Sequence, residues 1–379
     1  MRIAFFILVI VHGLIHLAGF VKAFGLSDVK QLTQTISKPF GVVWLLAFIF
    51  FAIAAIMFAF KTGHWWLFGL IAVVTSQVLI ISFWHDAKFG TIVNVIILIA
   101  AIIGYVTFGY YSKYQNDVKI ALQQPAYFQS SELTEADIQY LPGPVKNYLR
   151  FTGSIGKPKV NNFKIEFTGK IRKDEQSEWM QFTSEQYNFM GTPTRLFFMK
   201  AVMKNLPVAG YHCFRNGDAF MDIRLLSLFK VQYQDGVEMD LSETVTFFND
   251  MCCLAPPTLI DKRIKWSDVQ GNKVKGSFTN NNITVSAWLY FNDKGELINF
   301  ISEDRYSADP GKQFPWSTPL KDYQEISGYK LMGNGDAIYS YPDRDLCYGT
   351  FKLTSIEYNC KNIDQIDHKG QLAKPPAKF

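Results

Sequence analysis

The sequence is short of charge, and the shortage is local. Asp, Glu, Lys and Arg make up 19% of its 379 residues, whereas a soluble globular domain carries about 25%. Charged residues are scarce between Ile3 and Tyr111 and occur at ordinary density from Lys113 onward. The net charge of +5 contains no long run of Lys or Arg, so nucleic acid is not an expected partner. The composition predicts an apolar N-terminal part and a more ordinary C-terminal part, with a boundary near Ser112.

Motifs for catalysis are also missing. The chain has no GxSxG, HExxH or P-loop sequence, each of which would mark a known catalytic or nucleotide-binding geometry. Only His212 lies among the predicted strands, so a Ser-His-Asp arrangement would depend on that one residue. Glu303 and Arg305 share a face at strand spacing, a pattern typical of a surface ion pair. We therefore assign no catalytic residue, metal ligand or cofactor.

The cysteines are few and are not spaced for metal binding. There are five, and none forms a CxxC pair. Cys347 and Cys360 lie on or just after one predicted strand, where a rise of about 3.3 Å per residue would separate them by roughly 40 Å, too far for a disulfide. Cys252 and Cys253 are neighbours, and a disulfide between neighbours is strained. We expect the cysteines, Cys213 included, to be mostly free and buried.

Four long apolar runs fill the N-terminal part. A bilayer core requires about 20 consecutive apolar residues, and the runs that satisfy this are Ile3 to Phe24, Phe40 to Phe60, Trp65 to Trp84, and Gly90 to Tyr111. Aromatic residues stand at several of their ends, as in membrane interfaces. Residues 1–112 are therefore expected to be a four-helix, multi-pass domain in the cell membrane, with lipids as partners. Basic residues are divided equally between the two sides, so they do not orient it.

The first apolar run carries two histidines. His12 and His16 share one face of the predicted helix with small residues, a composition typical of a seam between helices. Gln77 and Asn94 lie at a similar depth in the third and fourth runs. These four residues form a predicted intramembrane polar cluster. Ionisable residues in a membrane are functional candidates, so a cofactor or proton site is one interpretation. A neutral imidazole pair that joins helices by hydrogen bonds is the other.

The remainder of the chain has the pattern of a β domain. Residues 113–157 predict a helical linker, in which "LPGPVKNYLRFTG" has Pro144 at a first helical position. From about residue 158 to 361 the period changes to two, beginning with "FKIEFTGKI", and turn signals such as Asn216-Gly217 recur. We count about ten or eleven strands in an antiparallel meander. Residues 362–379 are polar and are predicted to be a disordered tail.

One helix is predicted inside the β domain. In "DLSETVTFFNDMCCLAPP", Asp240 has the position of an N-cap with Glu243 three residues later, a capping-box pattern. Leu241, Val245, Phe248 and Cys252 form an apolar stripe. A sheet of this length, with no other long helix to cover it, is expected to curl around this one, giving an α+β fold. The candidate ligand-binding residues are Phe248, Cys252, Phe198, Trp288, and Trp316 in a Pro-bounded loop that folds over the sheet as a plug or a lid.

Four segments carry a resemblance to a known family. They resemble an uncharacterised bacterial family, a domain of unknown function, and read "LPGPVKNYLRFTG", "NDMCCLAPPTLID", "PWSTPLKDY" and "YGTFKLTSIEYN". Some members of that family also carry N-terminal spans that contain the sequence "HGLIHLAGF". The resemblance covers most of residues 140–360 and implies no mechanism. More distantly, the architecture is similar to lipoprotein-carrier-like half-barrels, which hold acyl chains. That analogy implies an extracytoplasmic β domain.

The sequence is compatible with three functions. The first is a membrane-anchored envelope protein whose β domain binds a hydrophobic ligand, either a lipid or a lipoprotein acyl chain, because aromatic residues crowd its strands. The second is a structural or signalling envelope protein that acts through protein contacts at the sheet edge. The third is a redox or cofactor-binding membrane protein that uses His12 and His16. A large open apolar cavity favours the first.

Overall fold

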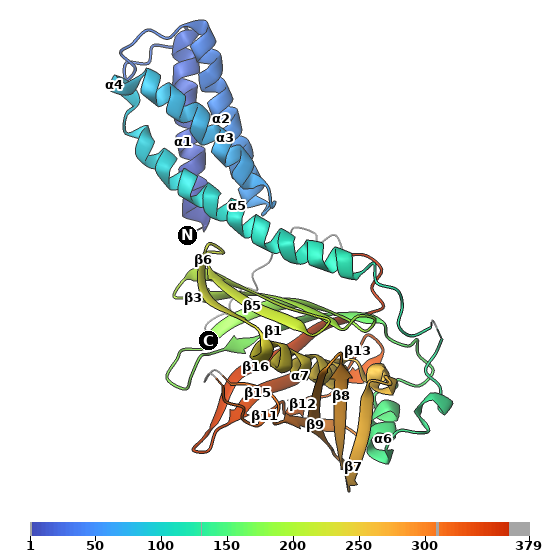
Figure 1. Cartoon of the computed structure of the whole chain (residues 1–379). Coiled ribbons are helices and arrows are strands. Elements are labelled where there is room, and N and C mark those ends of the chain that lie inside the picture. The colour runs from blue at the N-terminus through green and yellow to red at the C-terminus, as the bar shows by residue number, and fades with distance from the viewer. Residues whose placement is uncertain (1, 130, 308–310, 364–379) are drawn as a thin grey trace. The chain divides into compact units, whose positions relative to one another are not determined.

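The computed structural model describes residues 2–129, 131–307 and 311–363. This part of the chain divides into two compact units, one up to Ser112 and one from Lys113 to Ile363 (Figure 1). The tail predicted for residues 362–379 lies, from residue 364 onward, outside the described residues.

The first unit is a bundle of long apolar helices. It contains α1 (Arg2–Ala23), α2 (Lys38–Ala59), α3 (Trp65–Ser82), the short α4 (Trp84–Ala87) and the beginning of α5 (Gly90–Ala121). In the described residues, α1, α2, α3 and α5 are long and apolar enough to cross a membrane. Small residues allow close packing: a Cβ atom at Gly19 would overlap the ring of Trp44. The four predicted apolar runs are therefore helices.

Helix α5 is longer than predicted and enters the second unit. The expected end was Tyr111, whereas the helix continues to Ala121. Residues 112–121 contain neither Gly nor Pro to stop it, and Tyr114, Val118 and Ala121 are buried at helical spacing. Tyr114 packs on Phe198, with 5.3 Å between ring centroids. The end of α5 therefore covers one face of the sheet, and the expectation that no second long helix covers the sheet was wrong.

Two short helices precede the first strand. They are η1 (Ala136–Ile138) and α6 (Gly143–Phe151), where Pro144 occupies the first turn as the sequence predicts. Gly153 follows the helix with a φ of +67°, the left-handed conformation that ends many helices.

The β domain has more strands than expected. In chain order they are β1 (Asn162–Ile171), β2 (Met180–Phe189), β3 (Thr194–Met203), β4 (Leu206–Arg215), β5 (Asp218–Leu225), β6 (Phe229–Asp235), β7 (Ile264–Gln270), β8 (Lys273–Asn280), β9 (Ile283–Phe291), β10 (Leu297–Ser302), β11 (Trp316–Ser317), β12 (Leu320–Lys321), β13 (Gln324–Ile326), β14 (Tyr329–Leu331), β15 (Asn334–Ser340) and β16 (Asp345–Tyr358). The strands that were not predicted from the sequence are mostly two or three residues long, too short to show the alternation of apolar and polar residues.

Thirteen strands follow one another in a single antiparallel sheet, in the order β6-β5-β4-β3-β2-β1-β16-β15-β11-β10-β9-β8-β7, and β12 joins it beside β15. The first and last strands, β1 and β16, pair in the interior of this order. Strands β6 and β7 are consecutive along the chain but lie at opposite edges. The segment that connects them must therefore cross the whole sheet.

That connection is α7 (Val237–Leu254), and the sheet curls around it (Figure 1). The predicted fold class, four apolar helices followed by a curved antiparallel sheet with one helix, is confirmed. The predicted capping box is wrong: the helix begins at Val237 after Gly236, which has a φ of +82°. Asp240 instead accepts a hydrogen bond of 2.7 Å from the backbone N–H of Ala219.

Burial of α7 is wider than one apolar stripe. Every residue from Ser242 to Leu254 is buried, including the polar side chains of Glu243, Asn249 and Asp250. Buried polar groups require partners, and these partners define the candidate site.

Candidate functional site

A cavity of about 680 Å³ lies between α7 and the concave face of the sheet. Its volume falls in the range of roughly 300–1,000 Å³ that is usual for small-molecule sites. Strands β3 and β5 turn alternate residues toward it, because successive side chains on a strand point to opposite faces. The apolar lining includes Phe167, Phe197, Met199, Met221, Ile223, Met239 and Leu320. An apolar chain could therefore be held there out of water.

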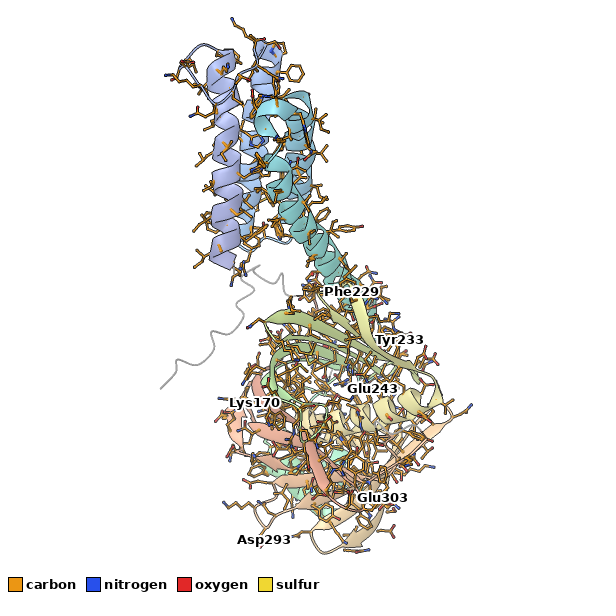
Figure 2. All side chains as sticks on the ribbon, turned by 90° about the vertical axis from the view of Figure 1, so that its left-hand side faces the viewer. Lys170, Phe229, Tyr233, Glu243, Asp293 and Glu303 are labelled. Carbon is orange, nitrogen blue, oxygen red and sulfur yellow. The ribbon has the colours of Figure 1, made fainter. Side chains whose placement is uncertain are left out.

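A buried ionic cluster forms part of the cavity wall. Arg195 of β3 donates three hydrogen bonds, each of 2.9 Å: Nε to Asp250 Oδ2, Nη1 to Glu243 Oε2, and Nη2 to Gln186 Oε1. Both carboxylates belong to α7, so this cluster fastens the helix to the sheet. Figure 2 labels Glu243 in the interior of the domain, and its side chain is 2% exposed.

The two carboxyl groups of this cluster differ in how readily they take a proton. Burial opposes ionisation of Glu243, but Arg195, His212 and Arg305 outweigh it and hold its pKa at about 2. Burial is the dominant effect at Asp250, whose pKa is raised although Arg195 also binds it. Of the two carboxyl groups, Glu243 is therefore the one that more readily stays ionised.

Arg305 lines the same cavity, in an environment unlike that of Arg195. It donates from Nε to the Tyr339 hydroxyl at 3.0 Å and from Nη1 to the Ser242 carbonyl at 3.0 Å, and it also bonds to the Thr246 hydroxyl. The expected surface ion pair with Glu303 is wrong, since Glu303 is exposed and Arg305 turns inward. Strand β10 ends at Ser302, so the two-residue period does not extend to these residues.

The five residues predicted to bind a ligand occupy three environments. Trp316 lines the cavity, but in strand β11, paired with β10 and β15, and not in the predicted loop. Phe248 and Cys252 are completely buried in the core, where Phe248 stacks on Phe278 at 5.8 Å between centroids.

Phe198 and Trp288 lie away from the cavity. Phe198 is on the opposite face of β3, beneath α5. Trp288 is half-buried, and the Lys273 ammonium lies 4.8 Å from its ring centroid. Of the five residues, the structure places only Trp316 on the cavity wall, and the ligand-binding roles of all five stay predictions.

A polar cluster at the cavity was not predicted from the sequence. Gln186 and Asn188 are two residues apart on β2 and so lie on the same face. Asn188 is directly opposite Arg195 in the sheet. Three polar residues on one face of two adjacent strands were a usable signal of a buried polar site. Their partner Asp250 is 55 residues from Arg195, and no local pattern connects the two.

The predicted intramembrane cluster is also assembled. His12 Nε2 lies 3.0 Å from Asn94 Oδ1, and His16 Nε2 lies 2.9 Å from Ser76 Oγ. Asn94 Nδ2 donates to both Ser76 Oγ and Gln77 Oε1, at 3.0 Å each. His16 Nδ1 lies 2.9 Å from the carbonyl of His12, so it donates there and Nε2 accepts from Ser76. All these bonds can form with neutral imidazoles, and whether the cluster has a function stays a prediction.

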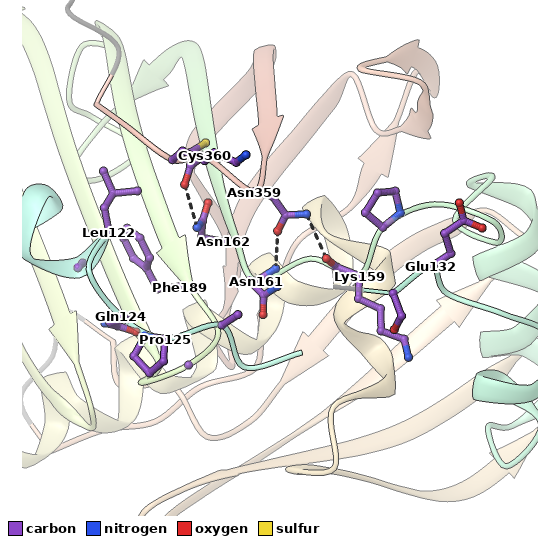
Figure 3. A pocket seen from close by; sticks show the side chains of 16 residues that line it. Leu122, Gln124, Pro125, Glu132, Lys159, Asn161, Asn162, Phe189, Asn359 and Cys360 are labelled. Atoms are coloured by element: carbon purple, nitrogen blue, oxygen red, sulfur yellow. Dashed lines mark hydrogen bonds between the residues drawn. The ribbon is translucent and has the colours of Figure 1, made fainter. Parts of the chain in front are cut away.

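A second hollow, of about 410 Å³, lies beside the beginning of β1 and the end of β16 (Figure 3). Its amide side chains bind the chain's own backbone: Asn359 Oδ1 accepts from the Asn161 N–H at 2.8 Å, and Asn359 Nδ2 donates to the Lys159 carbonyl at 3.1 Å. Asn162 Nδ2 donates to the Cys360 carbonyl at 3.2 Å. These bonds hold the two strand ends together, so we take the cavity under α7 as the candidate site.

Comparison with known proteins gives a family and some similar folds. No curated protein matches. Among similar solved structures is a domain from Vibrio parahaemolyticus described as an outer membrane lipoprotein-sorting protein domain, with 7% identity and a TM-score of 0.33 over 55% of this chain and 89% of that one. A DUF1329 family protein from Desulfovibrio piger ATCC 29098 has 10% identity and a TM-score of 0.32, over 62% and 96%. A LolA superfamily protein from Nitrosomonas europaea has 9% identity and a TM-score of 0.29, over 57% and 94%. The family of unknown function DUF6544 matches residues 131–351, more than half of the chain, and the protein belongs to that family.

Proposed function

We propose that this protein is a membrane-anchored binding protein whose β domain holds a hydrophobic ligand, such as a lipid or a lipoprotein acyl chain, in the cavity under α7. The observation that carries the proposal is the cavity itself. The β domain leaves a cavity of about 680 Å³ between helix and sheet, the size of a small-molecule site. An apolar ligand would remove that apolar wall from water.

The four long apolar helices support the anchoring part of the proposal. They would cross the membrane four times and place both ends of the chain on the same side. The β domain would lie outside the cytoplasm, next to a source of acyl chains.

A variant whose cavity is filled by a bulky side chain tests whether the cavity binds a ligand. Ile223 lines the cavity, whereas Ile298 is exposed on β10, so Ile223→Trp and Ile298→Trp add the same volume at different places. Binding of cis-parinarate, a fluorescent fatty acid, is measured with the full-length protein in phosphatidylcholine nanodiscs, after subtraction of empty nanodiscs. We expect Ile223→Trp to weaken binding at least tenfold at unchanged melting temperature, and Ile298→Trp to bind like the wild type. Equal binding by both variants, or no binding by the wild type, would contradict the proposal.

A second candidate function is favoured by the edge strand β6. Every residue of β6 is exposed, and Phe229 and Tyr233, which Figure 2 labels, are 57% and 46% exposed. An edge strand offers unpaired backbone groups to an extended segment of another protein. Photo-crosslinking from Val231 in the native membrane tests this, with Ile298 as the control position. A discrete product at Val231 alone supports a partner strand, and identical patterns at the two positions argue against it.

A further inference from the structure

The hydrogen-bonding capacity of Arg305 is only partly used. Its Nε and Nη1 atoms donate to Tyr339, Ser242 and Thr246. Within the described part of the chain, these bonds leave Nη2 without an acceptor. The guanidinium also lies 4.7 Å from the ring centroid of Trp316, a cation–π contact.

Arg305 also lacks a direct counter-ion. Arg195 binds two carboxylates and uses all three of its nitrogens, whereas every acceptor bound to Arg305 is neutral. Among the described residues, no carboxylate lies within ion-pair distance of Arg305. Glu243 raises the pKa of Arg305 by its charge, but its carboxylate is bonded to Arg195. Arg305 is only partly buried, and its neighbours raise its pKa, so its guanidinium stays charged in the cavity wall. A guanidinium that faces a cavity without a paired anion favours an anion brought by a ligand.

A second donor lies near this guanidinium. The Tyr348 hydroxyl accepts a hydrogen bond of 3.0 Å from Trp316 Nε1, and no described acceptor takes its own hydrogen. Tyr348 stacks on Tyr339 at 5.5 Å between centroids and also lines the cavity. Two donors therefore remain in the wall of the cavity.

We infer that Arg305 and Tyr348 bind the anionic oxygens of an amphiphilic ligand, a carboxylate or a phosphate, whose acyl chain lies along the apolar wall of the cavity. This inference rests on the proposed function and specifies the class of ligand. A guanidinium is a planar fork that matches the oxygens of carboxylate and phosphate. Phe197, Met199 and Ile223 supply the apolar wall for the chain.

The test compares ligands that differ only at the head. Oleate, methyl oleate and oleoyl lysophosphatidate compete with cis-parinarate on the full-length protein in phosphatidylcholine nanodiscs. We expect an anionic competitor to bind at least tenfold more tightly than methyl oleate. Tighter binding of oleate indicates a free fatty acid as the natural source, and tighter binding of lysophosphatidate indicates a phospholipid. Equal binding of methyl oleate and both anions overturns the inference but leaves the proposed function intact, whereas no displacement by any competitor overturns both.

Two variants connect this preference to the named residues. Arg305→Met keeps an apolar stem and removes the charge, and we expect it to lose the preference for anions while still binding methyl oleate. Tyr348→Phe keeps the aromatic ring and removes one donor, so it provides a test if Arg305→Met does not fold. We expect Tyr348→Phe to weaken anion binding severalfold without affecting methyl oleate. If both folded variants keep the wild-type preference, the anion binds elsewhere and the inference is wrong.

Discussion

Arg195 on β3 and Glu243 on α7 form a buried ion pair, with 2.9 Å between Nη1 and Oε2. The pair connects the helix to the sheet in the wall of the cavity. Removing one partner of such a pair leaves an uncompensated buried charge, and this costs about 3–5 kcal/mol. That is a large share of the total stability of a typical domain, about 5–15 kcal/mol.

Glu243→Gln is therefore expected to destabilise the β domain by about 3–5 kcal/mol. The measurement is urea denaturation of the full-length protein, followed by tryptophan fluorescence. Glu303→Gln is the matched control, because Glu303 is exposed and should change stability by less than about 0.5 kcal/mol. If Glu243→Gln unfolds at the wild-type urea concentration, the ion pair does not hold the helix.

The same pair predicts an acid sensitivity. The pKa of Glu243 is lowered from its ordinary value of 4.5 to about 2 in the folded protein. Its stabilising contribution is complete above about pH 4.5 and is lost as the pH falls toward about 2, and it amounts to roughly 3 kcal/mol. Urea midpoints measured across this range should fall more steeply for the wild type than for Glu243→Gln. Parallel curves would show that Glu243 has no depressed pKa.

Phe248→Asp is expected to unfold the β domain. Phe248 is completely buried and packs on Phe278 and Phe300, and an unpaired charge in that interior costs several kcal/mol. Phe229→Asp makes the same change at a residue that is 57% exposed and should melt near the wild-type temperature. A Phe248→Asp variant that also melts within a degree or two of the wild type would mean that α7 does not lie inside the sheet.

The chain is expected to cross the membrane four times, with both ends extracytoplasmic. Lys61 follows α2, so it should lie on the same side as the C-terminus. Enzyme-reporter fusions after Lys61 and after Phe379 should both report an extracytoplasmic location. Fusions that disagree with each other contradict four spans, and a cytoplasmic signal from both contradicts the orientation alone.

Replacement of both histidines distinguishes packing from chemistry in the polar cluster. If His12 and His16 only join helices, then the double variant with Gln at both positions should fold almost normally, because an amide can replace the bonds of a neutral imidazole. The double variant with Leu should be less stable, since it leaves Ser76 and Asn94 without these partners. Loss of a visible absorption band or of a proton-linked activity in the Gln variant would instead indicate a cofactor or a proton path.

The architecture was largely predictable because its signals are local. Four apolar runs, the alternation that begins at Phe163, and a helix stopped by Pro256 and Pro257 can each be read within about 20 residues. The start of α7 was not, because Asp240 and Glu243 imitate a capping box. In the folded chain, both carboxylates serve tertiary partners, Ala219 and Arg195.

The candidate site was less predictable because its parts are distant in the sequence. Arg195 and Asp250 are separated by 55 residues, and Arg305 bonds to α7 residues about 60 positions earlier. A single charged residue beyond a strand end is usually solvated, and nothing near Arg305 in the sequence indicates a cavity. Trp316 was placed in a loop because prolines flank it, whereas a two-residue strand can form between them.

The path of α7 between the two edges of the sheet limits how the domain can deform. The helix has 18 residues, a rigid length of about 27 Å at 1.5 Å per residue. It lies in the connection between the edge strands β6 and β7, whereas β1 and β16 lie in the middle of the curved sheet. Because an α-helix cannot lengthen without breaking its own hydrogen bonds, flattening the sheet would put α7 under tension. If the cavity takes a ligand, as proposed, the fixed length of α7 limits how far the sheet can open to admit it.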